Sequence, residues 1–175
     1  MSNDKTKPTR LKGRVHVVRD AEARPIDDID TDMIFHNAHL AITDVEKMGP
    51  YSFGNLKGWK DFPSRVKPGD ILVVGKNFGA GSSRQQAVDC FRALGVTAIV
   101  GESFGAIYFR NAINSGMPVF RVPEIMESAL KDGDEIELDL EKSTISASTL
   151  LPEPQPFSKV QLDIYLAGSL FKVTD

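Results

Sequence analysis

The stretch from Ile71 to Val100, ILVVGKNFGAGSSRQQAVDCFRALGVTAIV, decides the fold. It begins with an apolar, β-branched run at 71–75, which predicts a buried strand. A glycine-rich loop follows, and residues 83–94 then carry apolar side chains at helical spacing before Gly95 ends the helix. The run VTAIV at 96–100 predicts a second buried strand. A strand, a helix and a strand with short connections predict a parallel sheet with a right-handed crossover.

The same reading extends in both directions from this stretch. Further strands are expected at 11–18 and 118–122, and a second helix at 104–114. Residues 11–18 alternate and are rich in valine. The strands at 71–75, 96–100 and 118–122 are apolar without alternation, which is typical of burial on both faces. The sequence therefore predicts an α/β fold with a mostly parallel central sheet.

The last third of the chain has a different pattern. Residues 134–140 and 144–148 alternate around a polar turn, which predicts an added, solvent-facing β-hairpin. Residues 160–170 are apolar enough to dock back as a helix. Residues 33–64 carry glycines and prolines without a long period, so we expect loops with short helices there.

Length and composition exclude several classes of protein. The chain has 175 residues, 41% of them hydrophobic and 26% charged, with a net charge of −3. These values predict a single domain over 11–175 after a flexible lead-in at 1–10. A mildly acidic chain lacks the excess of positive charge that is typical of nucleic-acid-binding proteins. No apolar run approaches the roughly 18 residues of a membrane span. The polar N-terminus lacks the apolar stretch of a secretory signal, so we expect a cytoplasmic protein.

The single cysteine, Cys90, limits the metal chemistry of the chain. It cannot form an intrachain disulfide or by itself hold an iron–sulfur cluster, which typically takes about four thiolates. It falls within an apolar helical pattern, so we expect a small core residue. Any metal site must use oxygen ligands or histidines, or come from another chain.

The loop GKNFGAGSSR at 75–84 is the strongest candidate for chemistry. It leaves the carboxyl end of a parallel strand and opens a helix, which is the usual ligand crevice of open α/β sheets. Ser82 or Ser83 is a natural N-cap, the helix N-terminus suits anions, and Arg84 can grip a carboxylate bidentately. The loop predicts a carboxylate or phosphate cradle beside a hydroxyl; a tight turn capped by a serine explains it equally well.

Other named motifs are absent from this loop. It lacks the phosphate-binding GxxxxGK[ST] pattern and the dinucleotide fingerprint, and no nucleophile elbow occurs. The acidic run at 27–32 begins like a calcium loop but has Met33 and His39 where that loop needs glycine and glutamate. We expect its aspartates to cap turns and to pair with basic side chains. His16 lies in a strand pattern and is expected to be structural, and no partner spacing supports a metal site at His36 or His39.

Three segments together resemble a known family: DDIDTDMI at 27–34, GKNFGAGSSRQQAV at 75–88 and SFGAIYFRNAINSGMPV at 103–119. The chain is similar to small subunits of the aconitase-type isomerases, in particular those of 3-isopropylmalate dehydratase. The resemblance implies the swivelling β/β/α fold of the aconitase C-terminal domain. It also implies a heterodimer or heterotetramer in which a separate large subunit carries a [4Fe–4S] cluster, while this chain holds no metal or cofactor.

The resemblance also implies roles for particular residues. Ser82 would be the catalytic base, working as an alkoxide, and Arg84 would bind a substrate carboxylate, with Gly81 and Ser83 beside them. The segment at 36–43 aligns with the family's mobile, substrate-selecting loop, which we place at about 36–58. Its substrate-facing residues would be His39, Leu40, Ala41 and Ile42.

The resemblance also bears on the substrate. Homoaconitase-like members carry arginine where this chain has Ala41, so an apolar substituent is favoured here. The implied reaction is the isomerisation of 2-isopropylmalate to 3-isopropylmalate in leucine biosynthesis, by dehydration and rehydration of a small hydroxy-dicarboxylate. The chain departs from the family pattern at His39, which bears on the substrate, and also at Ala80, which is not a catalytic position, and at Gln85–Gln86. Two alternatives stay open. One is a related hydro-lyase acting on homoaconitate, methylated malate or citrate-like acids, and the other is a non-catalytic carboxylate-binding module.

Overall fold

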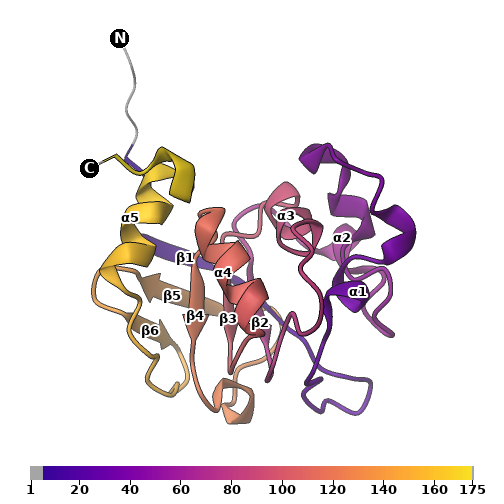
Figure 1. Ribbon diagram of the computed structural model, residues 1–175. Coiled ribbons are helices and arrows are strands. Elements are labelled where there is room, and N and C mark those ends of the chain that lie inside the picture. The colour runs from indigo at the N-terminus through magenta and orange to yellow at the C-terminus, as the bar shows by residue number, and fades with distance from the viewer. Residues whose placement is uncertain (1–5, 175) are drawn as a thin grey trace.

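Six strands form one sheet in the order β4-β3-β2-β1-β5-β6, in a computed structural model that describes residues 6–174 (Figure 1). The neighbours among β1 to β4 pair in parallel, whereas β5 pairs antiparallel with β1 and β6 antiparallel with β5. The predicted parallel sheet with an added hairpin is therefore confirmed. The strands are β1 Arg10–Val17, β2 Ile71–Val74, β3 Ala98–Gly101, β4 Val119–Arg121, β5 Glu135–Asp139 and β6 Thr144–Ala147.

The helices follow the predicted order, but two of them begin later than expected. They are α1 Thr31–Ile34, α2 Phe62–Arg65, α3 Gln86–Ala93, α4 Ala106–Asn114 and α5 Lys159–Ala167. Short 3-10 turns occur at η1 Asn37–His39, η2 Val45–Lys47, η3 Gly49–Tyr51, η4 Ile125–Glu127 and η5 Leu170–Lys172. The expected helix at 83–94 begins only at Gln86 and the one at 104–114 at Ala106, and the loops and short helices expected at 33–64 are confirmed.

Alternate strand residues enter two separate cores, one on each face of the sheet. Leu72 and Val74 of β2 join the core beneath α3 and α4, and Ile71 and Val73 join the core on the opposite face. Because every residue of β2 and β3 is buried, both strands read as continuous apolar runs in the sequence.

The hairpin is not solvent-facing throughout, which corrects the sequence-based prediction. Ile136 and Leu138 of β5 are fully buried in the second core, because β5 pairs with β1 and turns one face inward. The exposed residues expected from the alternation lie mainly on the edge strand β6.

The predicted lead-in at 1–10 falls partly outside the described residues. Arg10 already belongs to β1, and the Pro8 carbonyl accepts a 2.8 Å hydrogen bond from the Tyr165 hydroxyl of α5. The Thr9 carbonyl likewise accepts one from the N–H of Leu140. In Figure 1 the start of β1 and α5 accordingly lie together, far from α1 and α2.

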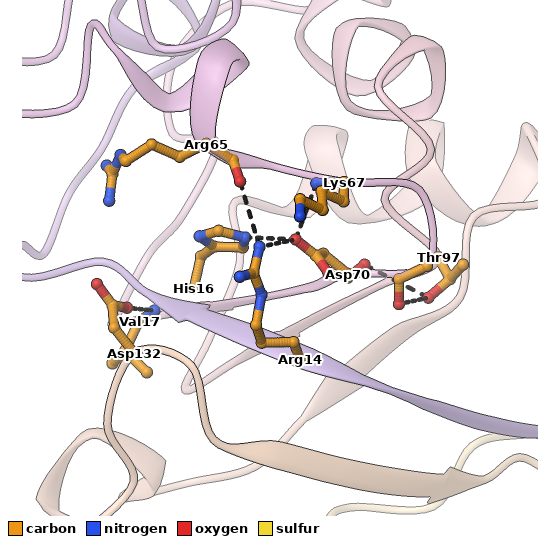
Figure 2. Close-up of polar contacts among 9 residues, drawn as sticks. Arg14, His16, Val17, Arg65, Lys67, Asp70, Thr97 and Asp132 are labelled. Atoms are coloured by element: carbon orange, nitrogen blue, oxygen red, sulfur yellow. Dashed lines mark hydrogen bonds and ion pairs between the residues drawn. The ribbon is translucent and has the colours of Figure 1, made fainter.

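A buried ionic network fixes the start of β2 to β1, as Figure 2 shows. Asp70 Oδ2 lies 2.7 Å from His16 Nε2 and accepts hydrogen bonds from Arg14 and from the Lys67 N–H. Burial raises the pKa of the Asp70 carboxyl, but the hydrogen bonds from His16, Lys67 and Arg14 outweigh it and hold that pKa below its ordinary value. His16 is therefore structural, as expected.

Replacing Asp70 by asparagine is expected to lower the free energy of unfolding by about 3 kcal/mol at pH 7, since Arg14 and His16 lose a buried anionic partner. The folded carboxyl has a lowered pKa, so its contribution is present above the unfolded pKa of about 3.9 and disappears as the pH falls below it. Urea unfolding between pH 7 and pH 3 measures this difference. Asp61→Asn, at an exposed ion pair, is the control and should change little. An Asp70→Asn effect as small as that of the control would contradict the account.

Candidate functional site

The glycine-rich loop leaves β2 and is held in place by the acidic segment 27–32. Backbone hydrogen bonds of 2.7–3.0 Å join the two segments in a parallel arrangement. The Thr31 hydroxyl extends the contact by donating to the Ser82 carbonyl at 3.0 Å. The paired groups are Asp28 N–H with the Lys76 carbonyl, Gly79 N–H with Ile29, and Thr31 N–H with Ala80.

The aspartates act as turn caps and ion-pair partners, which confirms the interpretation made from the sequence. Asp30 caps α1 by accepting the Met33 N–H, and Asp27 accepts the N–H of Lys76. Within residues 6–174 there is no cluster of three or more potential metal-ligating side chains.

Both serines of the loop are exposed at the carboxyl edge of the sheet. Neither caps α3, which corrects the prediction: the N-cap is Gln85, and no side chain caps the helix there. The Ser83 hydroxyl instead accepts a 3.1 Å hydrogen bond from Asn111 of α4. Ser82 is held only through its backbone carbonyl within the described part of the chain, so its hydroxyl faces solvent without a partner.

Arg84 turns back toward the acidic segment. Its Nη1 donates to Asp32 at 3.0 Å and to the Phe35 carbonyl at 2.7 Å, and its side chain is only 11% exposed. The hydrogen bonds from Arg84 and from the Asn37 N–H hold the pKa of Asp32 below its ordinary value. Nη1 is thus occupied, and the remaining edge of the guanidinium has no partner among residues 6–174, so it can meet a carboxylate.

Glycine is required where the loop passes over α4. Gly79 has a φ of 78°, and a Cβ there would lie 2.1 Å from Cγ of the Tyr108 ring. On the other side, a Cβ on Gly105 would lie 2.8 Å from the Gly79 carbonyl oxygen. The serine loop and the segment at 103–105 therefore contact each other through their backbones.

Gly79→Ala is expected to destabilise the fold by about 3 kcal/mol, because it combines an unfavourable φ with a clash against a buried ring. Chemical denaturation measures the loss. Gly133→Ala is the matched control, since Gly133 also has a positive φ, of 87°, but a Cβ there meets nothing within 4 Å. Equal losses in the two variants would show that the Tyr108 contact is unimportant.

The expected substrate loop lies next to the serine loop. Gln86 Nε2 donates to the Leu40 carbonyl at 3.3 Å, and the His39 ring lies 4.2 Å from the Tyr51 ring. Leu40 and Ala41 are exposed, whereas Ile42 packs partly against the core. The structure thus brings residues 39–42 toward the 81–86 segment. His36 accepts the N–H of Ala38.

Sequence reasoning missed three contributors to this site: Thr31, the Phe35 carbonyl and Asn111. Asn111 lies within the family-like segment 103–119, but nothing in its spacing indicates that it reaches Ser83. Cys90 is fully buried, and burial raises the pKa of its thiol to about 12, which confirms it as a core residue. None of the described helices has the length and apolar character that a membrane crossing requires.

Comparisons with known proteins agree with this geometry. The family model of the aconitase C-terminal domain matches residues 26–124. The 3-isopropylmalate dehydratase small subunit of Caldicellulosiruptor saccharolyticus is 37% identical over 93% of this chain and 89% of its own length. The corresponding subunit of Pyrobaculum aerophilum is 42% identical over 82% of this chain and 88% of its own.

A solved structure agrees in fold. The crystal structure of 3-isopropylmalate dehydratase from Methanocaldococcus jannaschii superposes with a TM-score of 0.81 and 33% identity, covering 94% of this chain and 92% of that chain. The expected fold of the aconitase C-terminal type is thereby confirmed. The chain belongs to the aconitase C-terminal domain family and, within it, to the family of 3-isopropylmalate dehydratase small subunits.

Proposed function

We propose that this chain is the small subunit of a cytoplasmic hydro-lyase that isomerises 2-isopropylmalate to 3-isopropylmalate in leucine biosynthesis. Relatives that are named as small subunits of 3-isopropylmalate dehydratase align with this chain over most of their own length. The chain works only with a large subunit, because its own candidate site is open to solvent on one side. The observation that carries the proposal is the exposed Ser82, whose hydroxyl has no partner in residues 6–174, next to the anchored Arg84.

In this proposal Ser82 removes a proton from a substrate carbon and later returns one. A serine hydroxyl is a weak base unless its anion is stabilised. The backbone N–H groups of Ser83 and Arg84 donate to no backbone acceptor among residues 6–174, so they and the Arg84 guanidinium can supply that stabilisation. Loss of the proton from one carbon and of hydroxide from its neighbour gives an unsaturated diacid and water; readdition of water in the opposite orientation gives the isomer.

Arg84 holds a substrate carboxylate with the edge of its guanidinium that faces away from Asp32. Because Asp32 and the Phe35 carbonyl fix Nη1, the plane of the guanidinium is set before substrate arrives. Ser83, held by Asn111, and Gly81 shape the wall beside it.

The residues of this chain do not fit a metal cluster: its single cysteine is buried and free, and residues 6–174 form no group of ligands. We assign a [4Fe–4S] cluster to the large subunit, where it would supply Lewis-acid assistance to the departing hydroxide.

The segment 36–58 selects the substrate and moves as it closes. Exposed Leu40 and Val45 give it apolar surface, and the 3.3 Å hydrogen bond from Gln86 is its polar link to the serine loop. Ala41 offers no charge, which favours a substrate with an apolar substituent. Ala41→Arg is therefore expected to lower kcat/KM for isopropylmalate about 10-fold and to raise it for a tricarboxylic acid. Ala38→Arg on the same exposed turn is the control; equal preferences in the two variants would contradict the assignment of Ala41.

Co-expression with the large subunit and an absorbance assay on unsaturated diacids test the proposal. The alkene derived from isopropylmalate should turn over at least 10-fold faster than those derived from homocitrate, methylmalate or citrate. A preference for one of these acids would assign the chain to a related hydro-lyase. If a stable complex with a loaded cluster turned over none of these acids, the chain would be assigned as a non-catalytic carboxylate-binding module.

A further inference from the structure

A cavity lies at the opposite end of the strands from Ser82. It has a volume of about 390 Å³ and opens where β1, β3 and β4 begin and where α3 and α4 end. The candidate catalytic loop leaves the carboxyl end of β2, which lies in the same sheet and runs parallel to these strands. The cavity is therefore separate from the site described above.

The walls of this cavity combine an apolar floor with cations. No aspartate or glutamate lines it, whereas Lys7 and Arg92 do. The hydroxyls of Ser115 and Thr97 already donate to backbone carbonyls and need no further acceptor. The apolar part of the wall consists of Pro8, Leu11, Val96, Met117, Pro118 and the ring of Tyr165.

Two of the cations at this cavity, Lys7 and Lys172, have no acidic partner among residues 6–174. The nitrogens Nζ of Lys7 and Lys172 both come within 3.9 Å of the position that a Cβ on Gly168 would take. Neither lysine forms an ion pair with any of the described residues, and Lys7 lies 5.0 Å from the centroid of the Tyr165 ring. Arg92 pairs with Asp89 through a single nitrogen at 3.1 Å. Burial, Arg92 and Lys172 together hold the pKa of Lys7 below its ordinary value.

We propose that this cavity binds a small carboxylate with an apolar tail. The carboxylate lies between Lys7 and Arg92, and the tail lies against Leu11, Val96 and Met117. An anion at this place relieves the repulsion among the three cations, and the tail contacts a wall that is largely apolar. A volume of about 390 Å³ is within the range of small-molecule sites and accommodates an acid of about six carbons.

Titration of the isotope-labelled full chain with 4-methylpentanoate, followed by amide chemical shifts, tests the site without any turnover assay. We expect saturable shifts confined to the amides around Gly95, Thr97 and Met117. Acetate, which lacks the tail, and 4-methylpentan-1-ol, which lacks the charge, should each bind at least 10-fold more weakly.

Two variants separate charge recognition from simple apolar contact. Lys7→Gln should weaken 4-methylpentanoate at least 10-fold while the amide spectrum shows an intact fold. Lys142→Gln, on the exposed hairpin turn, should leave the affinity unchanged. Equal binding of acid and alcohol, an unchanged affinity in Lys7→Gln, or no saturable shifts up to about 10 mM would overturn the proposal.

Discussion

Ser82→Ala, in complex with the large subunit, is expected to lower kcat about 1,000-fold, within the usual contribution of a general base of about 10² to 10⁴. The side chain is exposed and packs against nothing that a methyl group would disturb. The position of the backbone is retained, because Thr31 holds the Ser82 carbonyl rather than its hydroxyl. Steady-state assays with isopropylmalate and with the intermediate alkene measure the effect.

Ser146→Ala is the matched control for this prediction. Ser146 is exposed on β6, at the far edge of the sheet, and should retain full activity. Co-purification with the large subunit shows whether Ser82→Ala still assembles, as we expect. Full activity of an assembled Ser82→Ala complex would remove Ser82 from the role of base.

Arg84→Lys is expected to lower kcat/KM about 100-fold, or about 3 kcal/mol of transition-state stabilisation. A lysine can contact Asp32 or the Phe35 carbonyl, but it cannot hold both and still present a flat pair of donors to a carboxylate. Most of the loss should appear in KM, because the carboxylate is bound in the ground state as well. The KM and kcat of the reconstituted enzyme distinguish this role from a purely structural one.

Arg24→Lys is the control for the arginine prediction. Arg24 is exposed and pairs with Asp20, far along the chain from the loop, so the substitution should change neither constant. If Arg84→Lys lowered only the stability of the chain and left KM unchanged, Arg84 would be a structural anchor for Asp32 and not a substrate ligand.

The parallel sheet could be predicted from the sequence because its strands are short apolar runs between clear turn signals. The start of α3 could not be predicted in this way, because it depends on a contact between residues that are distant in the sequence. Arg84 turns back to Asp32 and to the Phe35 carbonyl, which holds residues 82–84 out of the helix. The same contact leaves Ser82 and Ser83 free of a capping role.

The packing of residues 35–62 also could not be predicted from the sequence. Phe35, Phe53, Trp59 and Phe62 are buried in the first core, yet they follow neither a helical nor a strand period. Their positions are fixed by contacts with rings that are distant in the sequence. The ring centroids of Phe53 and Phe91, for example, lie 5.0 Å apart. The resemblance located the serine loop, whereas the contact from Asn111 to Ser83 requires the folded chain.

The central claim is that this chain supplies half of an active site, and reconstitution of turnover tests it most directly. Each subunit would be purified separately, the large one with its cluster intact, and the formation of the unsaturated diacid from isopropylmalate would be followed by absorbance. We predict no turnover by either subunit alone and turnover that rises to saturation as this chain is added to the large subunit. Turnover by the large subunit alone, unchanged when this chain is added, would contradict the account.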